Sequence, residues 1–498
     1  MPEAFPFVVV GTAYHAPTAD RLEVLADVAI GVDAAGTITA VHAAASANGV
    51  ALVAAAPRVH RLASGERLLP GLVDLHIHAP QWPQLGTGLD LPLEQWLFAH
   101  TFPLEARYAD TAFAHDVWDH MVPTLLGHGT TTAVYFASVH EAATMALAQT
   151  CSRHRQRAFV GRVAMDHPQG TPDWYRDASA AQGVAASKRS IDAIRALGDP
   201  LVQPIVTPRF VPACTDELLA GLGRLAAEEG VLVQTHCSES DWEHDHVLAR
   251  YGVGDATALR DLGLLRRGTV LAHGNLLGDD DFAAIARADA GVAHCPMSNA
   301  YFANAVFPTR RAMAAGVKVG LGTDIAGGAQ PGLLSQCGLA VTVSRMLHDG
   351  VDARLPASDR GVASSRIDVV TAFHVGTAGG GDVLGVKVGR LQPGYQFDAI
   401  VVDTDGATTN SRTGLRAWPA VDDEARLFEK IVRLAGPPTS PGCGLRVRAR
   451  ARRVRGTPRA RTCSGRASWT RSRPRRARTS PARHRSTGRS PIAPRPCR

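Results

Sequence analysis

Eight short apolar segments recur along residues 70–324, and most of them end in polar side chains. Nearly continuous apolar runs, such as Val231-Leu232-Val233, are typical of parallel strands buried on both faces. Amphipathic stretches separate the segments. In the clearest of these, leucines recur at helical spacing between Thr215, a suitable N-cap, and Gly230, a suitable stop. The strand segments are 70–81, 129–137, 159–166, 201–210, 231–239, 269–275, 291–299 and 318–324.

Strands that alternate with helices in this way predict an α/β fold, a (β/α)8 TIM barrel. In such barrels the catalytic residues lie at the C-terminal ends of the strands. The alternative is a doubly wound open sheet. It is disfavoured because no glycine-rich phosphate-binding loop follows the first strand segment.

Histidines and a carboxylate stand at several of these strand ends. His76 and His78 are two residues apart, so in a strand their imidazoles point to the same face. An isolated His-x-His pair is as often a pair of buried structural histidines as a metal site. However, His236, His273 and Asp324 end later strands and are expected at the same rim of the barrel. The sequence therefore predicts a metal site.

The residue types indicate which metal this site would hold. Three imidazoles, from His76, His78 and His236, and the carboxylate of Asp324 suit one Zn²⁺ per chain, with Fe²⁺ as the alternative. Such an ion lowers the pKa of bound water from ~16 towards ~7. The cysteines contain no C-x-x-C pair, which argues against a structural zinc site and against the deaminases with a P-C-x-x-C signature.

The motifs resemble a known family. The metal-site residues, spread over 68–330, resemble the amidohydrolase superfamily, and four shorter stretches resemble its guanine deaminases. Met297 and Trp82 depart from the pattern, since relatives often have Asn at the first position and a smaller aromatic residue at the second. The four stretches are 78–81, 86–97, 207–210 and 323–328.

This resemblance implies hydrolysis of guanine to xanthine and ammonia, a step of purine catabolism. Glu239 would move a proton to and from the ring nitrogen, a role worth ~10²–10⁴ in rate. Asp324 would accept a proton from the attacking water, which His273 would orient. For Glu239 the alternative is an exposed carboxylate at a strand end.

Recognition of guanine rests on five predicted contacts, which are Gln81, Trp82, Arg209, Phe210 and His273. Arg209 offers a planar fork of donors, Gln81 can both donate and accept, and Phe210 or Trp82 could stack on the ring. The alternatives are a salt bridge for Arg209 and core packing for Phe210. Another amidohydrolase substrate (a triazine, an adenosine-like compound or cytosine) remains open, as does a non-catalytic protein that binds nucleic acid through its tail.

The segments on either side of the barrel, 68–380, contain short β-like runs. The resemblance implies that 1–67 and 381–436 form one small flanking β-sandwich domain, and that the protein is a homodimer. The sequence shows no signal peptide and no apolar stretch of about 18 residues, and its cysteines are scattered. We therefore expect a cytoplasmic protein without a membrane span.

The last segment, 437–498, has a different composition. It contains 19 Arg and no Lys, Asp or Glu, so the rest of the chain carries 34 basic and 46 acidic residues and a net charge of −12. The tail could be a disordered nucleic-acid-binding arm, a linker or a frameshift product. We favour a frameshift, because residues 437–447 admit codons that encode an alternating strand in another frame. The last strand of the small domain would then be missing, leaving an unpaired edge.

Overall fold

The computed structural model describes residues 6–405, 414–436 and 446–448. The predictions for the Arg-rich tail therefore lie almost entirely outside the described residues. Within these residues, no helix combines the length and the apolar character that crossing a membrane requires.

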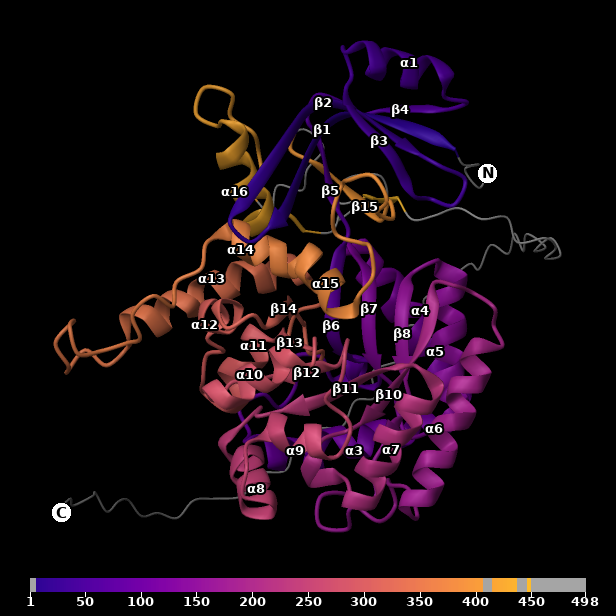
Figure 1. Cartoon of the computed structure of the whole chain (residues 1–498), viewed down its shortest axis with the longest axis vertical. Helices are drawn as coiled ribbons and strands as arrows, with labels where there is room; N and C mark the ends of the chain where they lie inside the picture. The colour runs from indigo at the N-terminus through magenta and orange to yellow at the C-terminus, as the bar shows by residue number, and fades with distance from the viewer. Residues whose placement is uncertain (1–5, 406–413, 437–445, 449–498) are drawn as a thin grey trace, which may run out of the picture. The chain divides into compact units, whose positions relative to one another are not determined.

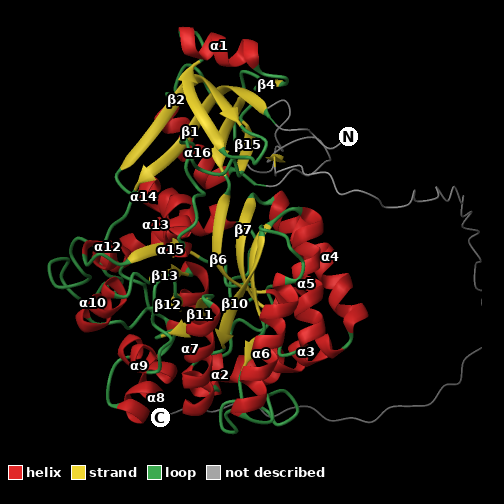
Figure 2. Cartoon of the chain, turned by 45° about the vertical axis from the view of Figure 1, so that its right-hand side comes forward, coloured by secondary structure: helices red, strands yellow, loops and turns green. Residues whose placement is uncertain are grey.

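The eight predicted strands are present and close into a parallel barrel (Figures 1 and 2). β6 pairs with β7 on one side and β14 on the other, and β10 pairs with β11, so the sheet has no open end. The (β/α)8 prediction is thus confirmed, and the open-sheet alternative is wrong. The barrel strands are β6 (Leu72–His78), β7 (Thr130–Phe136), β8 (Arg157–Gly161), β10 (Val202–Pro208), β11 (Leu232–Cys237), β12 (Val270–His273), β13 (Gly291–His294) and β14 (Lys318–Leu321), with the short β9 (Val163–Ala164) beside β10.

Helices surround the barrel strands, and α7 (Asp216–Glu229) shows how the sequence sets their limits (Figure 2). The Thr215 hydroxyl accepts a hydrogen bond from the Leu218 backbone N–H at 3.2 Å, which satisfies a donor that the first turn leaves free. Gly230 ends the helix in the left-handed conformation, at φ +61°. Both ends were predicted.

The remaining α-helices range from short turns to the long α4 and α13. They are α1 (Ala47–Ala55), α2 (Leu93–Trp96), α3 (Phe102–Ala106), α4 (Thr111–Gly127), α5 (Glu141–His154), α6 (Ala180–Arg195), α8 (Asp241–Tyr251), α9 (Asp255–Asp261), α10 (Asp279–Arg287), α11 (Pro296–Ser298), α12 (Thr309–Ala314), α13 (Leu333–Asp349), α14 (Val369–His374), α15 (Gly380–Leu384) and α16 (Glu424–Leu434).

A seven-stranded sheet, built from both flanks of the barrel, forms the small domain (Figure 1). The changeover from this sheet to the barrel lies at Gly71, between β5 and β6, a few residues beyond the predicted boundary at 67/68. Its strands are β1 (Phe7–Thr18), β2 (Arg21–Val32), β3 (Ile38–Ala43), β4 (Val59–Arg61), β5 (Glu66–Pro70), β15 (Ala399–Asp403) and β16 (Arg446–Arg448).

The outer edge of this sheet bears on the frameshift hypothesis. We expected β15 to lack a neighbour there, but β16 pairs with it antiparallel over Ala399–Val401. The pairing covers three residue pairs, whereas β5 pairs with β15 over five. The frameshift hypothesis requires a longer closing strand at this edge, and that strand stays a prediction.

Candidate active site

Four side chains predicted as metal ligands meet at the C-terminal ends of the barrel strands. The Nε2 atoms of His78 and His236 lie 2.9 Å apart. Asp324 Oδ1 lies 3.2 Å from His76 Nε2 and 3.6 Å from His78 Nε2. All four side chains are buried. The structure therefore brings together the ligand set proposed from the sequence.

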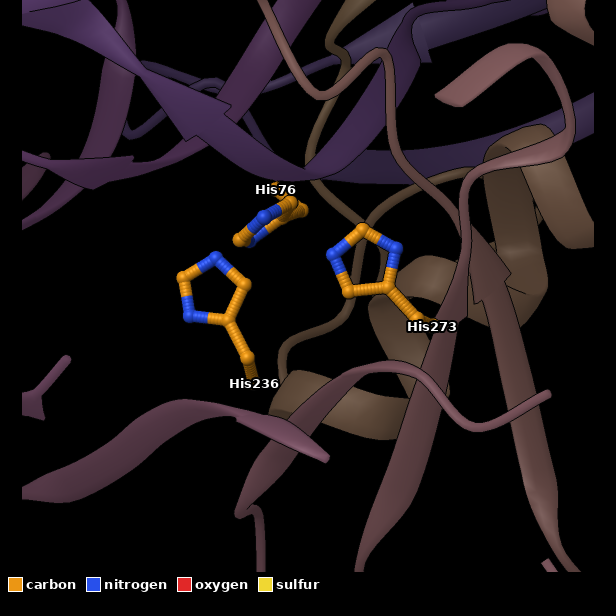
Figure 3. Close-up of side chains that lie close together, drawn as sticks. All are labelled: His76, His236 and His273. Carbon is orange, nitrogen blue, oxygen red and sulfur yellow. The ribbon is translucent and has the colours of Figure 1, made fainter. Parts of the chain in front are cut away.

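His273 joins this cluster from β12 (Figure 3). Its Nε2 atom lies 4.0 Å from Asp324 Oδ2 and 3.6 Å from Glu239 Oε1. Potential ligand atoms of His76, His236 and His273 all lie within 4.8 Å of one another. His273 thus lies close to both Asp324 and the proposed proton carrier Glu239, while its role in orienting the water stays a prediction.

Hydrogen bonds from outside the cluster orient two of the imidazoles. His236 Nδ1 donates to the Arg209 carbonyl oxygen at 2.6 Å, which leaves Nε2 as the free nitrogen. His273 Nδ1 lies 2.9 Å from Asn299 Oδ1, and the Asn299 amide nitrogen lies 3.4 Å from His294 Nδ1. His294 is therefore a supporting residue, and Asn299 is a contact that the sequence analysis did not identify.

Asp74 connects the first and last barrel strands beneath the cluster. Its carboxylate accepts the Thr323 hydroxyl at 2.6 Å, the Thr323 backbone N–H at 3.0 Å and the His76 backbone N–H at 3.2 Å. Burial raises the pKa of Asp74 to about 7. This side chain fixes the backbone on both sides of the site, next to His76 and Asp324.

Three site residues adopt backbone conformations that side chains rarely take. Ser238, His273 and Asp324 have φ values of +49°, +76° and +48°. Ser238 follows β11, His273 ends β12 and Asp324 lies three residues beyond β14, and such conformations cost about 1–3 kcal/mol apiece. The surrounding structure holds these strained positions, which bring the side chains of His273 and Asp324 into the cluster, while the Ser238 hydroxyl donates to Asp255 at 2.8 Å.

The cluster has the properties of a divalent-cation site. Burial lowers the pKa values of His76, His78 and His236 well below the usual range, so these imidazoles are neutral and keep a lone pair. Within the described chain, neither His76 Nε2 nor His273 Nε2 has a hydrogen-bond partner, although both are buried. Unpartnered nitrogens beside a buried carboxylate fit a bound metal ion.

Glu239 follows β11 and lies in the same buried region. Its backbone N–H donates to Glu243 Oε2 at 2.8 Å, and its carbonyl accepts from the Asn275 amide at 2.9 Å. Burial, with a smaller contribution from the charge of Asp324, raises the pKa of Glu239 well above its usual value. Glu239 is only 5% exposed, so the alternative of an exposed strand-end carboxylate is wrong.

A cavity opens onto the cluster and is lined by both polar and apolar side chains. Besides the histidines, its polar residues are Gln81, Arg209, Glu239 and Asp324. The ring centroids of Trp96 and Phe302, which also line it, lie 5.1 Å apart. The lining residues are His78, Gln81, Leu93, Trp96, Leu97, Arg209, Phe210, His236, Glu239, Phe302 and Asp324.

Of the predicted substrate contacts, Gln81, Arg209 and Phe210 line this cavity, whereas Trp82 and His273 do not. Trp82 also lies outside the histidine–carboxylate cluster. It is half-buried, and its indole N–H donates to His120 Nδ1 at 2.9 Å. Trp96 and Phe302 supply the aromatic surfaces in its place. Trp96 lies within the motif 86–97 and could have been chosen from it, whereas no sequence signal marks Phe302.

Arg209 lines the cavity and also forms a buried ion pair, so its position fits both the predicted substrate contact and the alternative of a salt bridge. Nη1 and Nη2 donate to Glu105 at 2.7 and 3.2 Å, and the Phe102 ring centre lies 4.9 Å from Cζ. Glu105 also accepts from Gln81 Nε2 at 3.0 Å. Glu105 follows the η2 segment (Leu97–Thr101) and lies in α3, where no sequence motif indicates a functional residue.

A closed barrel with imidazoles and carboxylates gathered at its C-terminal rim defines a metal-dependent hydrolase. Comparison with known proteins agrees. The amidohydrolase family matches residues 67–428. The guanine deaminase of Dictyostelium discoideum is 37% identical over 342 residues, covering 68% of this chain and 73% of that protein. The human guanine deaminase is 33% identical over 399 residues, covering 79% and 85%.

Solved structures give the same result. The guanine deaminase from C. acetobutylicum, with guanine bound in its active site, aligns with a TM-score of 0.77 at 26% identity. That alignment covers 87% of this chain and 97% of the other. This chain therefore belongs to the amidohydrolase family, and its relatives group it with the guanine deaminases.

Proposed function

We propose that this protein hydrolyses guanine to xanthine and ammonia. The observation that carries the proposal is the cavity, which places Arg209, Gln81 and Glu239 beside the imidazole–carboxylate cluster. A purine in this cavity would contact hydrogen-bonding groups and the metal site together. The guanine deaminase relatives support the same assignment.

His76, His78, His236 and Asp324 would hold one divalent ion. Zinc suits this donor set best, and Fe²⁺ is the alternative. An ion held there would lower the pKa of a water molecule bound to it, which would supply the nucleophile near neutral pH. The neutral imidazoles and unpartnered nitrogens described above support this role.

The remaining groups of the site supply proton transfers. Asp324 takes a proton from the water as its oxygen attacks C2 of guanine. Glu239, whose raised pKa favours the protonated form, donates a proton to ring nitrogen N3. His273, within 4.0 Å of both carboxylates, orients the water and stabilises the developing charge. The amino group then accepts the proton held by Asp324 as its bond to C2 breaks. The new hydroxyl on C2 returns a proton to Glu239 and becomes the carbonyl of xanthine, so ammonia and xanthine are released and both carboxyl groups regain their starting states.

Arg209 and Gln81 supply the polar contacts to the purine, and Phe210, Trp96 and Phe302 enclose its faces. A site that hydrogen-bonds particular edges rejects analogues without them by large factors. Aromatic walls add stacking with little specificity. Trp82 has no place in this arrangement. The homodimer and the cytoplasmic location stay predictions.

Product analysis with a panel of substrates tests this function. Purified protein is incubated with guanine, adenosine, cytosine and an aminotriazine, before and after chelation and after addition of zinc. We expect xanthine from guanine, no product from the others, loss of activity on chelation and recovery with zinc. Turnover of another compound instead of guanine would contradict the roles of Arg209 and Gln81.

A further inference from the structure

Glu105 forms hydrogen bonds to two of the polar residues that line the cavity, although no sequence motif marks it. It is 1% exposed, and each of its carboxylate oxygens accepts two hydrogen bonds. Oε1 accepts from Gln81 Nε2 at 3.0 Å and Arg209 Nη2 at 3.2 Å. Oε2 accepts from Arg209 Nη1 at 2.7 Å and the Tyr175 hydroxyl at 3.0 Å. One carboxylate thus holds both proposed guanine-recognition residues.

This arrangement fixes which protons of Arg209 remain for a ligand. Glu105 takes the edge formed by Nη1 and Nη2, and the Phe102 ring covers one face of the guanidinium. Within the described chain the Nε–H donates to no residue, so the edge that contains Nε is free. Such an edge presents two parallel donors, the pattern that arginine uses to bind O6 and N7 of guanine.

Glu105 also sets the orientation of the Gln81 side-chain amide. The amide oxygen accepts from the Ala326 backbone N–H at 3.1 Å while Nε2 donates to Glu105. A flipped amide would direct its oxygen at the Glu105 carboxylate and its NH₂ group at the Ala326 N–H, which repels on both sides. One N–H donor and one lone pair of Gln81 therefore remain in fixed directions.

The ion pair has an electrostatic consequence as well. Arg209 is 2% exposed, and a guanidinium buried without a counter-ion would be costly. The carboxylate of Glu105 compensates the charge of Arg209 next to the cavity. The pocket can then offer two guanidinium donors to a neutral purine without presenting a net positive charge.

We propose that Glu105 is a positioning residue that sets substrate specificity, by holding Arg209 and Gln81 in the donor pattern that recognises the 6-oxo edge of a purine. This inference rests on the proposed function, which it deepens. Glu105 touches neither the substrate nor the reacting atoms and acts through Arg209. Its loss should therefore weaken binding of 6-oxopurines more than it slows catalysis.

The test compares Glu105→Gln with wild type in steady-state kinetics on guanine. We expect KM to rise about tenfold or more, with kcat changed less than about threefold and the bound metal unchanged. Inhibition by hypoxanthine, which has the 6-oxo group, should weaken in parallel, and inhibition by unsubstituted purine should stay within about twofold. The matched control is Asp398→Asn, which breaks another nearly buried pair, with Arg157 at 3.1 Å, and should change stability alone.

A double-mutant cycle tests whether Glu105 acts through Arg209. Adding Glu105→Gln to Arg209→Gln should raise KM by no more than about threefold, a smaller factor than in wild type, because only Gln81 is then left for Glu105 to position. Independent effects that multiply would overturn the proposal. If the Glu105→Gln protein does not fold, Glu105→Asp takes its place, because it keeps the charge and shortens the reach.

An unchanged KM in a folded Glu105 variant overturns this inference and leaves the proposed function intact. Absence of guanine turnover by the metal-loaded wild type overturns the proposed function, and this inference with it.

Discussion

At the scale of single residues, the protonation of Glu239 matters most to the proposed reaction. Its raised pKa, caused by burial and the charge of Asp324, makes it a proton donor near neutral pH. Glu239→Gln keeps the shape of the side chain and removes the transferable proton. We expect kcat to fall by ~10²–10⁴, with melting temperature and metal content unchanged.

The matched control for this experiment is Glu228→Gln on the exposed face of α7, which should keep the wild-type rate. Steady-state kinetics and metal analysis of both variants decide the matter. A Glu239→Gln enzyme that keeps more than about a tenth of wild-type kcat would contradict the assigned role.

His244 gives the stability of the protein a predictable pH dependence. Its hydrogen bond to Asp255, at 3.1 Å, raises the pKa of His244 above 6.5, and Asp255 in turn accepts from the Ser238 hydroxyl and backbone N–H. A raised histidine pKa stabilises the fold fully below pH 6.5, and the contribution disappears as pH rises through the folded-state pKa.

His244→Gln should therefore lower the melting temperature most at pH 5.5–6.5, with a difference that shrinks on the alkaline side. Thermal melts of both proteins across pH 5.5–8.5 measure this. A difference that stays constant over that range would show that the charge of His244 does not contribute.

At the scale of elements, Asp74 joins β6 to the segment that follows β14. Its three hydrogen bonds hold the backbone of His76 and Thr323, the latter next to Asp324. Asp74→Asn removes the charge of the carboxylate, and its NH₂ group cannot accept from the Thr323 hydroxyl, so that bond is lost or must reverse its direction. Because residues that support ligands typically contribute 10–100-fold to metal affinity, we expect zinc affinity to fall by about that factor.

Competition with a chelator of known affinity measures the change. Asp33→Asn is the control, since Asp33 also accepts two backbone N–H groups, both at 2.8 Å, in a turn of the small domain. Equal zinc affinity in wild type and Asp74→Asn would contradict the role given to this carboxylate.

The elements also show how far sequence reasoning reaches. Barrel strands are buried on both faces, so segments such as 231–239 read as apolar runs, and their polar ends gave the positions of His236 and Glu239. The segment 93–106 is not a barrel strand and therefore has no apolar run that marks its position. Its conformation depends on tertiary contacts of Trp96 and Glu105, which neither periodicity nor spacing reveals.

The run 388–394 shows a similar limit. This run lies in the flanking segment 381–436, in which we expected β-like runs, but it forms bends and turns and no strand. Leu391 is buried in the core of the small domain with Val9 and Val401 without pairing in the sheet, whereas Val388 packs with Val73 and Leu75 of the barrel.

At the scale of the whole molecule, charge is divided between body and tail. Residues 437–498 carry 19 of the 53 basic residues, and the remainder has a net charge of −12. Deleting 449–498 keeps β16 and removes most of these arginines. We expect the shortened protein to lose retention on a polyanion column while its guanine kinetics stay the same.

A loss of guanine turnover in the shortened protein would show that the tail takes part in the activity. Sequencing the gene across Gly436 tests the frameshift separately. An intact reading frame that encodes these arginines would exclude it.

The most direct test of the central claim is mass spectrometry of the product formed from guanine in H₂¹⁸O. Water attack at C2 predicts xanthine that carries one ¹⁸O atom, one ammonia released per xanthine, and no reaction without metal. Metal-loaded protein that forms no xanthine, or that forms xanthine without the label, would contradict hydrolytic deamination at this site.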